Sequence, residues 1–122
     1  MLGHVNNIVY LRWAQDIAVA HWRAMALEEW RTRYIWVVAR HEVDYRAPLT
    51  LGTEVEARTW VDDAPARGAL WARFVEIGAP NAKPAAEIKS TWCLLDAATR
   101  RPVRVPKDII ARFASPSDAP PG

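Results

Sequence analysis

The sequence predicts an α+β fold in which one long helix is followed by four or five antiparallel strands. The segment from Ile8 to Leu27 contains almost no helix breakers and is rich in alanine, which favours a helix. After Arg33, β-branched and aromatic residues alternate with polar ones at the period of a strand. Clusters of proline and glycine divide the rest of the chain into short segments. We therefore expect an antiparallel sheet that curls around an apolar helix.

The length and composition indicate one folded domain. The chain has 122 residues, of which 51% are hydrophobic, and a domain of this size buries roughly two thirds of its unfolded surface. We expect the domain to cover residues 1–114, and the tail over residues 115–122, with three prolines and a glycine, to be disordered. The seven tryptophans are spread along the chain, which indicates core or interface anchors rather than one aromatic binding motif.

The predicted helix is apolar on nearly all sides, because its polar residues form only a narrow stripe. Such a helix has to be wrapped by other elements. Asn6 and Asn7 precede it, and their side-chain oxygens can cap amide groups of the first turn. The polar stripe consists of Arg12, Asp16 and Arg23.

The strands are predicted from alternation and from the turns between them. The expected strands are Tyr34 to Tyr45, Glu54 to Val61, Ala69 to Ile77, Ala85 to Leu95 and a short one from Val103 to Val105. Pro106 can begin a final helix through Phe113, because its missing amide costs nothing at the first helical position. A sheet of this size leaves an edge strand, which a homodimer can cover.

Charge and cysteine usage exclude several classes of function. The net charge is +2, from 16 basic and 14 acidic residues, and the arginines are scattered, so we expect no nucleic-acid partner. No apolar run approaches the about 20 residues that span a bilayer, so we expect no membrane segment. Cys93 is the only cysteine, which excludes an intrachain disulfide and a zinc site built from cysteines. We expect a cytoplasmic protein in which Cys93 is not a nucleophile.

The N-terminal motif Gly3-His4-Val5-Asn6-Asn7, followed by Ile8-Val9-Tyr10-Leu11-Arg12-Trp13, resembles that of hot-dog fold acyl-CoA thioesterases of the 4-hydroxybenzoyl-CoA thioesterase type. The resemblance continues through Val43-Asp44-Tyr45-Arg46-Ala47-Pro48-Leu49 and Gly52-Thr53-Glu54-Val55, and covers about residues 1–113. It implies a helix wrapped by a curved antiparallel sheet, a homodimer or homotetramer, and active sites at the subunit interface. The implied reaction is hydrolysis of an acyl-CoA to the free acid and coenzyme A, with no cofactor and no metal.

The chemistry of this reaction explains the importance of the helix start. Negative charge develops on the thioester carbonyl oxygen, and a helix N-terminus offers backbone donors and a partial positive charge. The resemblance implies that the amide of Asn7 polarises the carbonyl, with Gly3 and Asn6 beside the substrate. Capping of the helix by Asn6 and Asn7 is the alternative, and the two roles are compatible.

The sequence offers several candidates for the residue that transfers protons in this reaction. The resemblance places the catalytic carboxylate three residues before Gly3, immediately before Met1, and a strand before the motif, so we expect a longer natural chain. Otherwise His4, which titrates near neutrality, and Asp16 are candidates. Asp16 is also spaced to form an ion pair with Arg12, and His4 can have a structural role. Gln15, where the family often has Glu, can orient water but cannot take its proton.

Coenzyme A carries phosphates, so its site should be basic and near the surface. Arg46, Arg73 and Lys89 are the candidates, although a solvated surface charge is the alternative for each. We interpret His21 and His41 as non-catalytic. Two alternative functions stay open, a hot-dog hydratase or dehydratase and a non-catalytic acyl-CoA-binding protein. Thiol release from acyl-CoAs separates hydrolysis from binding.

Overall fold

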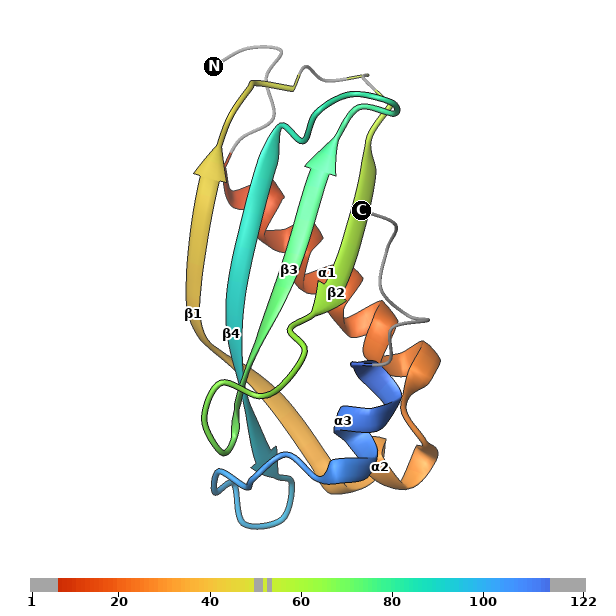
Figure 1. Ribbon diagram of the computed structural model, residues 1–122, viewed down its shortest axis with the longest axis vertical. Helices are drawn as coiled ribbons and strands as arrows, with labels where there is room; N and C mark the ends of the chain where they lie inside the picture. The colour runs from red at the N-terminus through yellow and green to blue at the C-terminus, as the bar shows by residue number, and fades with distance from the viewer. Residues whose placement is uncertain (1–6, 50–51, 53, 115–122) are drawn as a thin grey trace.

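In the described part of the chain, a four-stranded antiparallel sheet combines with three helices (Figure 1). The structure is a computed structural model that describes residues 7–49, 52 and 54–114. The elements in chain order are α1 (Asn7–Met25), α2 (Glu28–Arg33), β1 (Tyr34–Tyr45), β2 (Glu56–Val61), β3 (Leu70–Gly78), β4 (Ala86–Asp96) and α3 (Lys107–Phe113). The strand order is β1-β4-β3-β2, so β1 and β2 form the edges. This arrangement confirms the predicted fold class.

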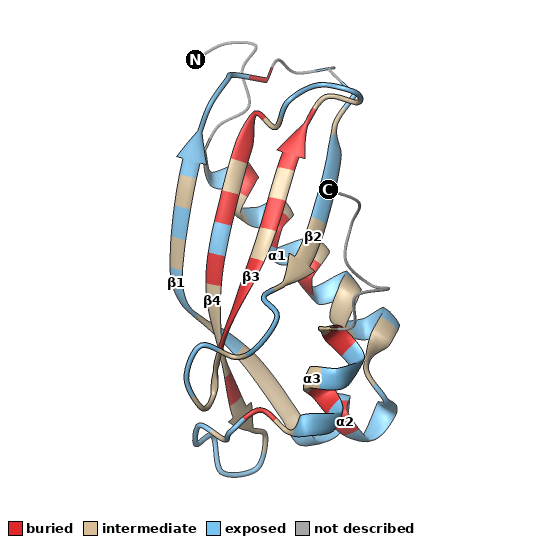
Figure 2. Ribbon diagram, in the orientation of Figure 1, coloured by how far each residue is buried: buried red, intermediate tan, exposed pale blue. Residues whose placement is uncertain are grey.

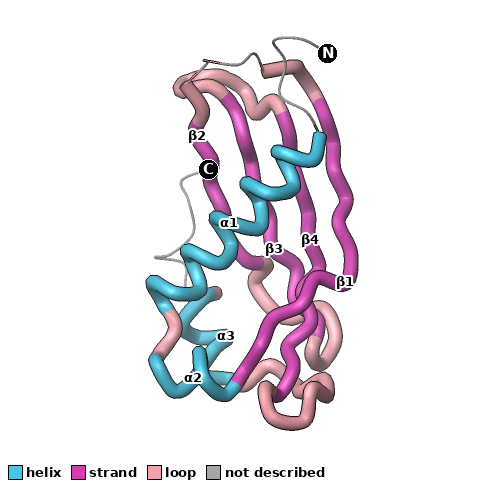
Figure 3. The backbone as a smooth tube through the Cα atoms, turned by 180° about the vertical axis from the view of Figure 1, so that it is seen from behind, coloured by secondary structure: helices cyan, strands magenta, loops and turns pink. Residues whose placement is uncertain are grey.

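Helix α1 lies diagonally across one face of the sheet, and α2 and α3 gather at the end of the sheet where α1 ends (Figure 3). Side chains alternate between the two faces of a strand, so Val75 and Ile77 of β3 and their neighbour Ile88 of β4 share the face that α1 covers. Figure 2 shows the buried residues of these central strands as alternating bands. The central strands thus form the floor on which α1 packs.

The core consists of two apolar clusters, one at each end of α1. The first cluster lies beneath the first half of α1, and its buried members are Tyr10, Ala14, Leu49, Val75, Ile77, Ala85, Ala86 and Ile88. The second cluster joins the sheet to α2 and α3, and its buried members are Trp30, Trp71, Leu94, Val105, Ile109 and Phe113. Trp30 and Trp71 are thus core anchors, as the sequence predicts.

A β-bulge in β1 lets one strand contribute to both clusters. Its register on β4 shifts between Val38 and Arg40, and an extra residue at this point reverses the alternation of the strand. Trp36 therefore packs against the second cluster and Val43 against the first, although they are an odd number of residues apart.

The long helix predicted to end at Leu27 ends at Met25, and a separate helix, α2, follows. Leu27 is extended, with φ −67° and ψ 151°, and this break turns Trp30 into the core, where it is 7% exposed and stacks on Trp22. The end of α1 is stabilised by Arg112, whose Nε donates to the carbonyl of Met25 at 2.8 Å. Burial of Trp30 therefore outweighs the local preference for one continuous helix.

Three other expectations need correction. A strand over Val103 to Val105 is not formed; a single bridge pairs Leu95 with Pro102, which has no amide to extend a ladder. The chain also does not wrap α1 fully, because the sheet covers one side and leaves Ile8 68% and Val19 39% exposed. Strand β1 has the predicted boundaries, whereas β2, β3 and β4 differ from theirs by one or two residues. The tail over residues 115–122 lies outside the described residues.

Candidate functional site

The start of α1 is held against the end of β1 by aromatic contacts. Tyr10 is 3% exposed, and its ring contacts Tyr45 edge to face with centroids 5.5 Å apart. Burial raises the pKa of Tyr10, so the phenol stays neutral. The amides of a first helical turn have no acceptor within the helix. Helix α1 begins at Asn7, and its first turn therefore lies beside the end of β1.

The structure tests the predicted residues at the helix start only in part. Gly3, His4 and Asn6 lie outside the described residues, and of Asn7 only the backbone position is described. The roles of these four residues remain predictions.

Gln15 and Asp16 lie on the exposed side of α1. They follow Asn7 by eight and nine residues, which places them about 12–14 Å along the helix axis from its start. Among the described residues, the ion pairs are Arg40 with Glu42 and Arg46 with Glu87, so the predicted pair between Asp16 and Arg12 is not formed. Within one chain the structure does not bring Gln15 and Asp16 to the helix start.

Arg46 is the predicted cation that lies nearest the helix start, because it follows Tyr45 directly. Its Nε donates to Oε2 of Glu87 at 2.7 Å, and this hydrogen bond raises the pKa of Arg46. The side chain is exposed. Arg46 is therefore accessible to a phosphate group, in competition with Glu87.

Lys89 lies on the other side of the sheet. Its neighbour Ile88 faces α1, so Lys89 points to the opposite face, where it is exposed and lies across from Glu42 of β1. The structure separates Lys89 from the start of α1.

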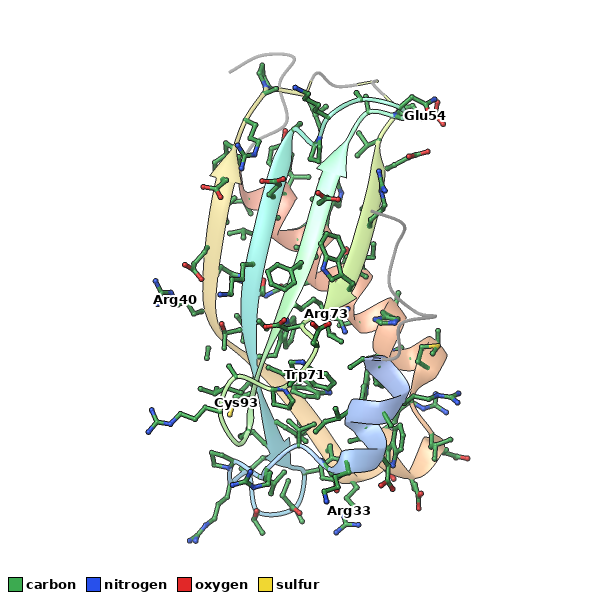
Figure 4. All side chains as sticks on the ribbon, in the orientation of Figure 1. Arg33, Arg40, Glu54, Trp71, Arg73 and Cys93 are labelled. Carbon is green, nitrogen blue, oxygen red and sulfur yellow. The ribbon has the colours of Figure 1, made fainter. Side chains whose placement is uncertain are left out.

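The expectation that Arg73 is a surface cation is wrong, because this residue is only 8% exposed. Figure 4 shows Arg73 and Trp71 in the interior, whereas Arg40 extends outward from the edge strand. Nη1 of Arg73 donates to Nδ1 of His21 at 2.9 Å and to Oγ1 of Thr59 at 3.0 Å. Burial lowers the pKa of Arg73 to about 10, so the guanidinium still carries its charge at neutral pH.

Arg73 belongs to a row of hydrogen-bonded side chains between the two apolar clusters. We call this row the polar belt; it comprises His21, His41, Thr59, Arg73 and Ser90. Arg73 and His41 are the cross-strand partners of Ser90, and Nδ1 of His41 lies 2.6 Å from the Ser90 hydroxyl. An arginine only donates, so Nδ1 of His21 accepts and the imidazole proton sits on Nε2.

Sequence reasoning missed the polar belt, although a signal existed. Arg73 shares its strand face with Trp71, Val75 and Ile77, all of them buried, so alternation places it inside. The contact between His41 and Ser90 resembles a base beside a nucleophile, but Ser90 is 2% exposed and a substrate cannot reach it. The contact between His41 and Ser90 is therefore part of the packing, and the interpretation of His21 and His41 as non-catalytic stays a prediction.

Three other features of the described residues bear on function: the cysteine, possible metal ligands and possible membrane-spanning helices. Cys93 is half-buried on the sheet face opposite α1. No three side chains of His, Cys, Asp or Glu among the described residues gather closely enough to hold a metal ion. None of the described helices is both long enough and apolar enough to cross a membrane.

Comparison with known proteins assigns the family. The sequence pattern of the "Thioesterase-like superfamily" matches residues 1–113. The chain belongs to this superfamily. No curated protein is significantly similar in sequence to this thioesterase-like chain.

Solved structures confirm the hot-dog fold. A thioesterase from Thermus thermophilus, complexed with coenzyme A and Zn, is 26% identical, with a TM-score of 0.77 over 97% of this chain and 84% of that one. A protein from Staphylococcus aureus in complex with CoA is 16% identical, with a TM-score of 0.81 over 99% of this chain and 78% of that one. A 1,4-dihydroxy-2-naphthoyl-CoA thioesterase from Synechocystis is 15% identical, with a TM-score of 0.75 over 97% and 88% of the two chains.

These findings support the resemblance at the level of the superfamily. They do not separate the 4-hydroxybenzoyl-CoA type from other types, since the Thermus neighbour is named only as a thioesterase and the Synechocystis neighbour acts on 1,4-dihydroxy-2-naphthoyl-CoA.

Proposed function

We propose that this thioesterase-like protein is an acyl-CoA thioesterase, which hydrolyses an acyl-CoA to a free carboxylic acid and coenzyme A. The observation that carries the proposal is the start of α1 at Asn7, held beside the end of β1 through the contact between Tyr10 and Tyr45. Because the chain belongs to a thioesterase-like superfamily, we interpret this helix start as the place where the thioester carbonyl binds.

The helix start suits the charge that the reaction develops. Water adds to the thioester carbonyl carbon, and the carbonyl oxygen becomes an oxyanion. The backbone amide of Asn7 donates to this oxygen, and the helix dipole adds a favourable potential. The C–S bond then breaks, the carbonyl reforms, and the thiolate of coenzyme A leaves and takes up a proton.

The proton that water loses needs a base. His4 is three residues from Asn7 in the sequence, and it can take the proton and then return it to the leaving thiolate. Asp16 is exposed but about 14 Å from the helix start of its own chain. Asp16 would therefore act across a subunit interface, in a homodimer or homotetramer, while Gln15 orients water.

Arg46 is the residue that we assign to the phosphates of coenzyme A, because it follows the end of β1 and remains exposed. The neighbours that were crystallised with coenzyme A support a ligand of this class. We assign no such role to Lys89, on the far face of the sheet, or to Arg73, in the interior.

The test is thiol release from a panel of acyl-CoAs by the wild type and two variants of Asn7. Asn7→Pro removes the amide donor at a helix position that accepts proline, and turnover should fall by about two to three orders of magnitude. Asn7→Ala keeps the donor and is the matched control, with turnover near that of the wild type. Unchanged turnover in an Asn7→Pro variant with normal melting temperature would refute the assignment.

A non-catalytic acyl-CoA-binding protein is the second candidate. Gln15, at the position where the family resemblance leads one to expect Glu, favours it, because an amide cannot take a proton from water. A thermal shift on addition of acyl-CoA without any thiol release would identify a binder.

A further inference from the structure

A cavity opens between the sheet and the second half of α1. Its volume is about 350 Å³, within the range of sites for small molecules. Its walls combine aliphatic side chains with six aromatic ones, which are Trp22, Tyr34, Trp36, Trp71, Trp92 and Phe113. Such walls suit a flat apolar group, which can stack on or fit edgewise against the rings.

The guanidinium of Arg73 stands in the wall of this cavity. Its Nη1 is occupied by His21 and Thr59, but no described residue accepts from Nε or Nη2. No carboxylate of the described residues lies within ion-pair distance of it. A buried charge is costly unless it is paired, so an anion in the cavity would supply the missing partner.

A second donor in the same wall is also without an acceptor. The indole Nε1 of Trp92 is buried and makes no hydrogen bond in the described part of the chain. Arg23 and Arg31 also line the cavity, but both are exposed, so Arg73 is the buried cation of its wall. One buried cation beside apolar side chains matches a ligand with one negative charge and an apolar body. A phosphate carries more charge than this one buried guanidinium neutralises.

We propose that this cavity binds a small carboxylate with an apolar, preferably aromatic, body, whose carboxylate accepts from Arg73. The site is separate from the start of α1. Trp22, on the cavity wall, follows Asn7 by 15 residues, which corresponds to about 22 Å along the helix. The carboxylate could come from a free acid or from the far end of an acyl group that is joined to coenzyme A.

Binding is tested with 2-naphthoate and its neutral counterpart 2-naphthamide, by titration calorimetry and by quenching of tryptophan fluorescence. The wild type should bind the naphthoate more tightly than the amide. Arg73→Met should weaken naphthoate binding on the order of 10- to 100-fold, the range for a charge-assisted hydrogen bond, and leave the amide unchanged. Arg40→Met, at an arginine on the outer edge, is the matched control and should bind like the wild type.

Two thioesters identify the source of the carboxylate. Adipoyl-CoA carries a terminal carboxylate that hexanoyl-CoA lacks. If adipoyl-CoA displaces naphthoate and hexanoyl-CoA does not, the carboxylate comes from the acyl group. If neither thioester displaces naphthoate, the ligand is a free acid. Each of these two results supports the proposed site. Displacement by both thioesters would overturn the role of the charge. These measurements need no turnover, so they are independent of whether the protein is a thioesterase.

A second variant covers the case in which Arg73→Met does not fold. Ala18→Leu adds volume to the cavity wall from a buried helix position and should weaken binding of both naphthoate and naphthamide. Equal affinity of the wild type for the two ligands would overturn the proposal, as would undiminished naphthoate binding by a folded Arg73→Met or Ala18→Leu variant. Failure to bind either ligand would overturn it as well, in favour of a cavity that a second copy of the chain covers.

Discussion

Replacing Arg73 by Met should leave the protein as stable as the wild type or make it more stable. The residue is 8% exposed, and burial lowers the pKa of its guanidinium from the usual arginine value to about 10. This difference corresponds to about 3 kcal/mol that opposes the charged form in the folded state. Methionine fills a similar volume and has no charge to bury.

The hydrogen bonds of Arg73 reduce this gain. Two bonds are lost, those to His21 and Thr59, and each contributes about 1 kcal/mol. Thr59 keeps a partner, since its hydroxyl also donates to the carbonyl of Phe74 at 2.9 Å. The net change is therefore between zero and about 2 kcal/mol in favour of the variant, or up to about 8 °C in melting temperature for a domain of this size.

Urea unfolding and calorimetry would measure this difference, with Arg40→Met as a surface control that changes stability by less than about 0.5 kcal/mol. The folded pKa of Arg73 lies below its unfolded value, so the destabilisation is complete below about pH 10 and decreases only above it. The difference between Arg73→Met and wild type should thus be constant from pH 6 to pH 9. A loss of more than about 2 kcal/mol in Arg73→Met would show that the guanidinium stabilises the fold, against the reasoning above.

Three further predictions concern the rest of the fold. Burial lowers the pKa of His41 below 6.5. As the pH falls below 6.5, His41 therefore takes up a proton in the unfolded state before it does so in the folded state, and the free energy of unfolding decreases. In urea unfolding, His41→Asn should lack this part of the pH dependence. Gly78→Ala should lower the free energy of unfolding in urea by about 1–2 kcal/mol, because its Cβ would lie 3.2 Å from backbone atoms of Lys83, Pro84 and Ala85, and an unchanged value would contradict this. The open edge of β1 and the exposed Val37 predict a dimer or larger oligomer in sedimentation, whereas a monomer at micromolar concentration would rule out a shared active site.

Local pattern was sufficient to predict the elements whose structure depends on near neighbours. The strand from Tyr34 to Tyr45 has the same boundaries in prediction and structure, because alternation and β-branched residues act within the strand itself. The break between α1 and α2 could not be predicted in this way. Ala26, Leu27 and Glu28 favour a helix, and the break depends on the fit of Trp30 against distant residues of the second cluster.

In the candidate site, too, local features could be predicted from the sequence and long-range contacts could not. The helix start is predicted at Ile8 from its sequence neighbours and is found one residue earlier, at Asn7. The interior position of Arg73 follows from alternation, but its bond to His21 joins residues 52 positions apart. That contact depends on the angle at which α1 crosses the sheet, which no local spacing encodes. The cavity is likewise assembled from both helices and strands, so its existence could not be predicted from any one segment.

The polar belt has a consequence for the alignment of α1. Apolar contacts are not directional, so the two clusters alone would accept the helix at neighbouring positions along the sheet. The bond between His21 and Arg73 is 2.9 Å long, and a slide of α1 by one turn, about 5.4 Å, would break it. The hydrogen bond between Arg73 and His21 therefore fixes the position of α1 along the sheet. Because the helix is stiff, the same bond also fixes the position of Asn7, at the other end of the helix, beside the end of β1.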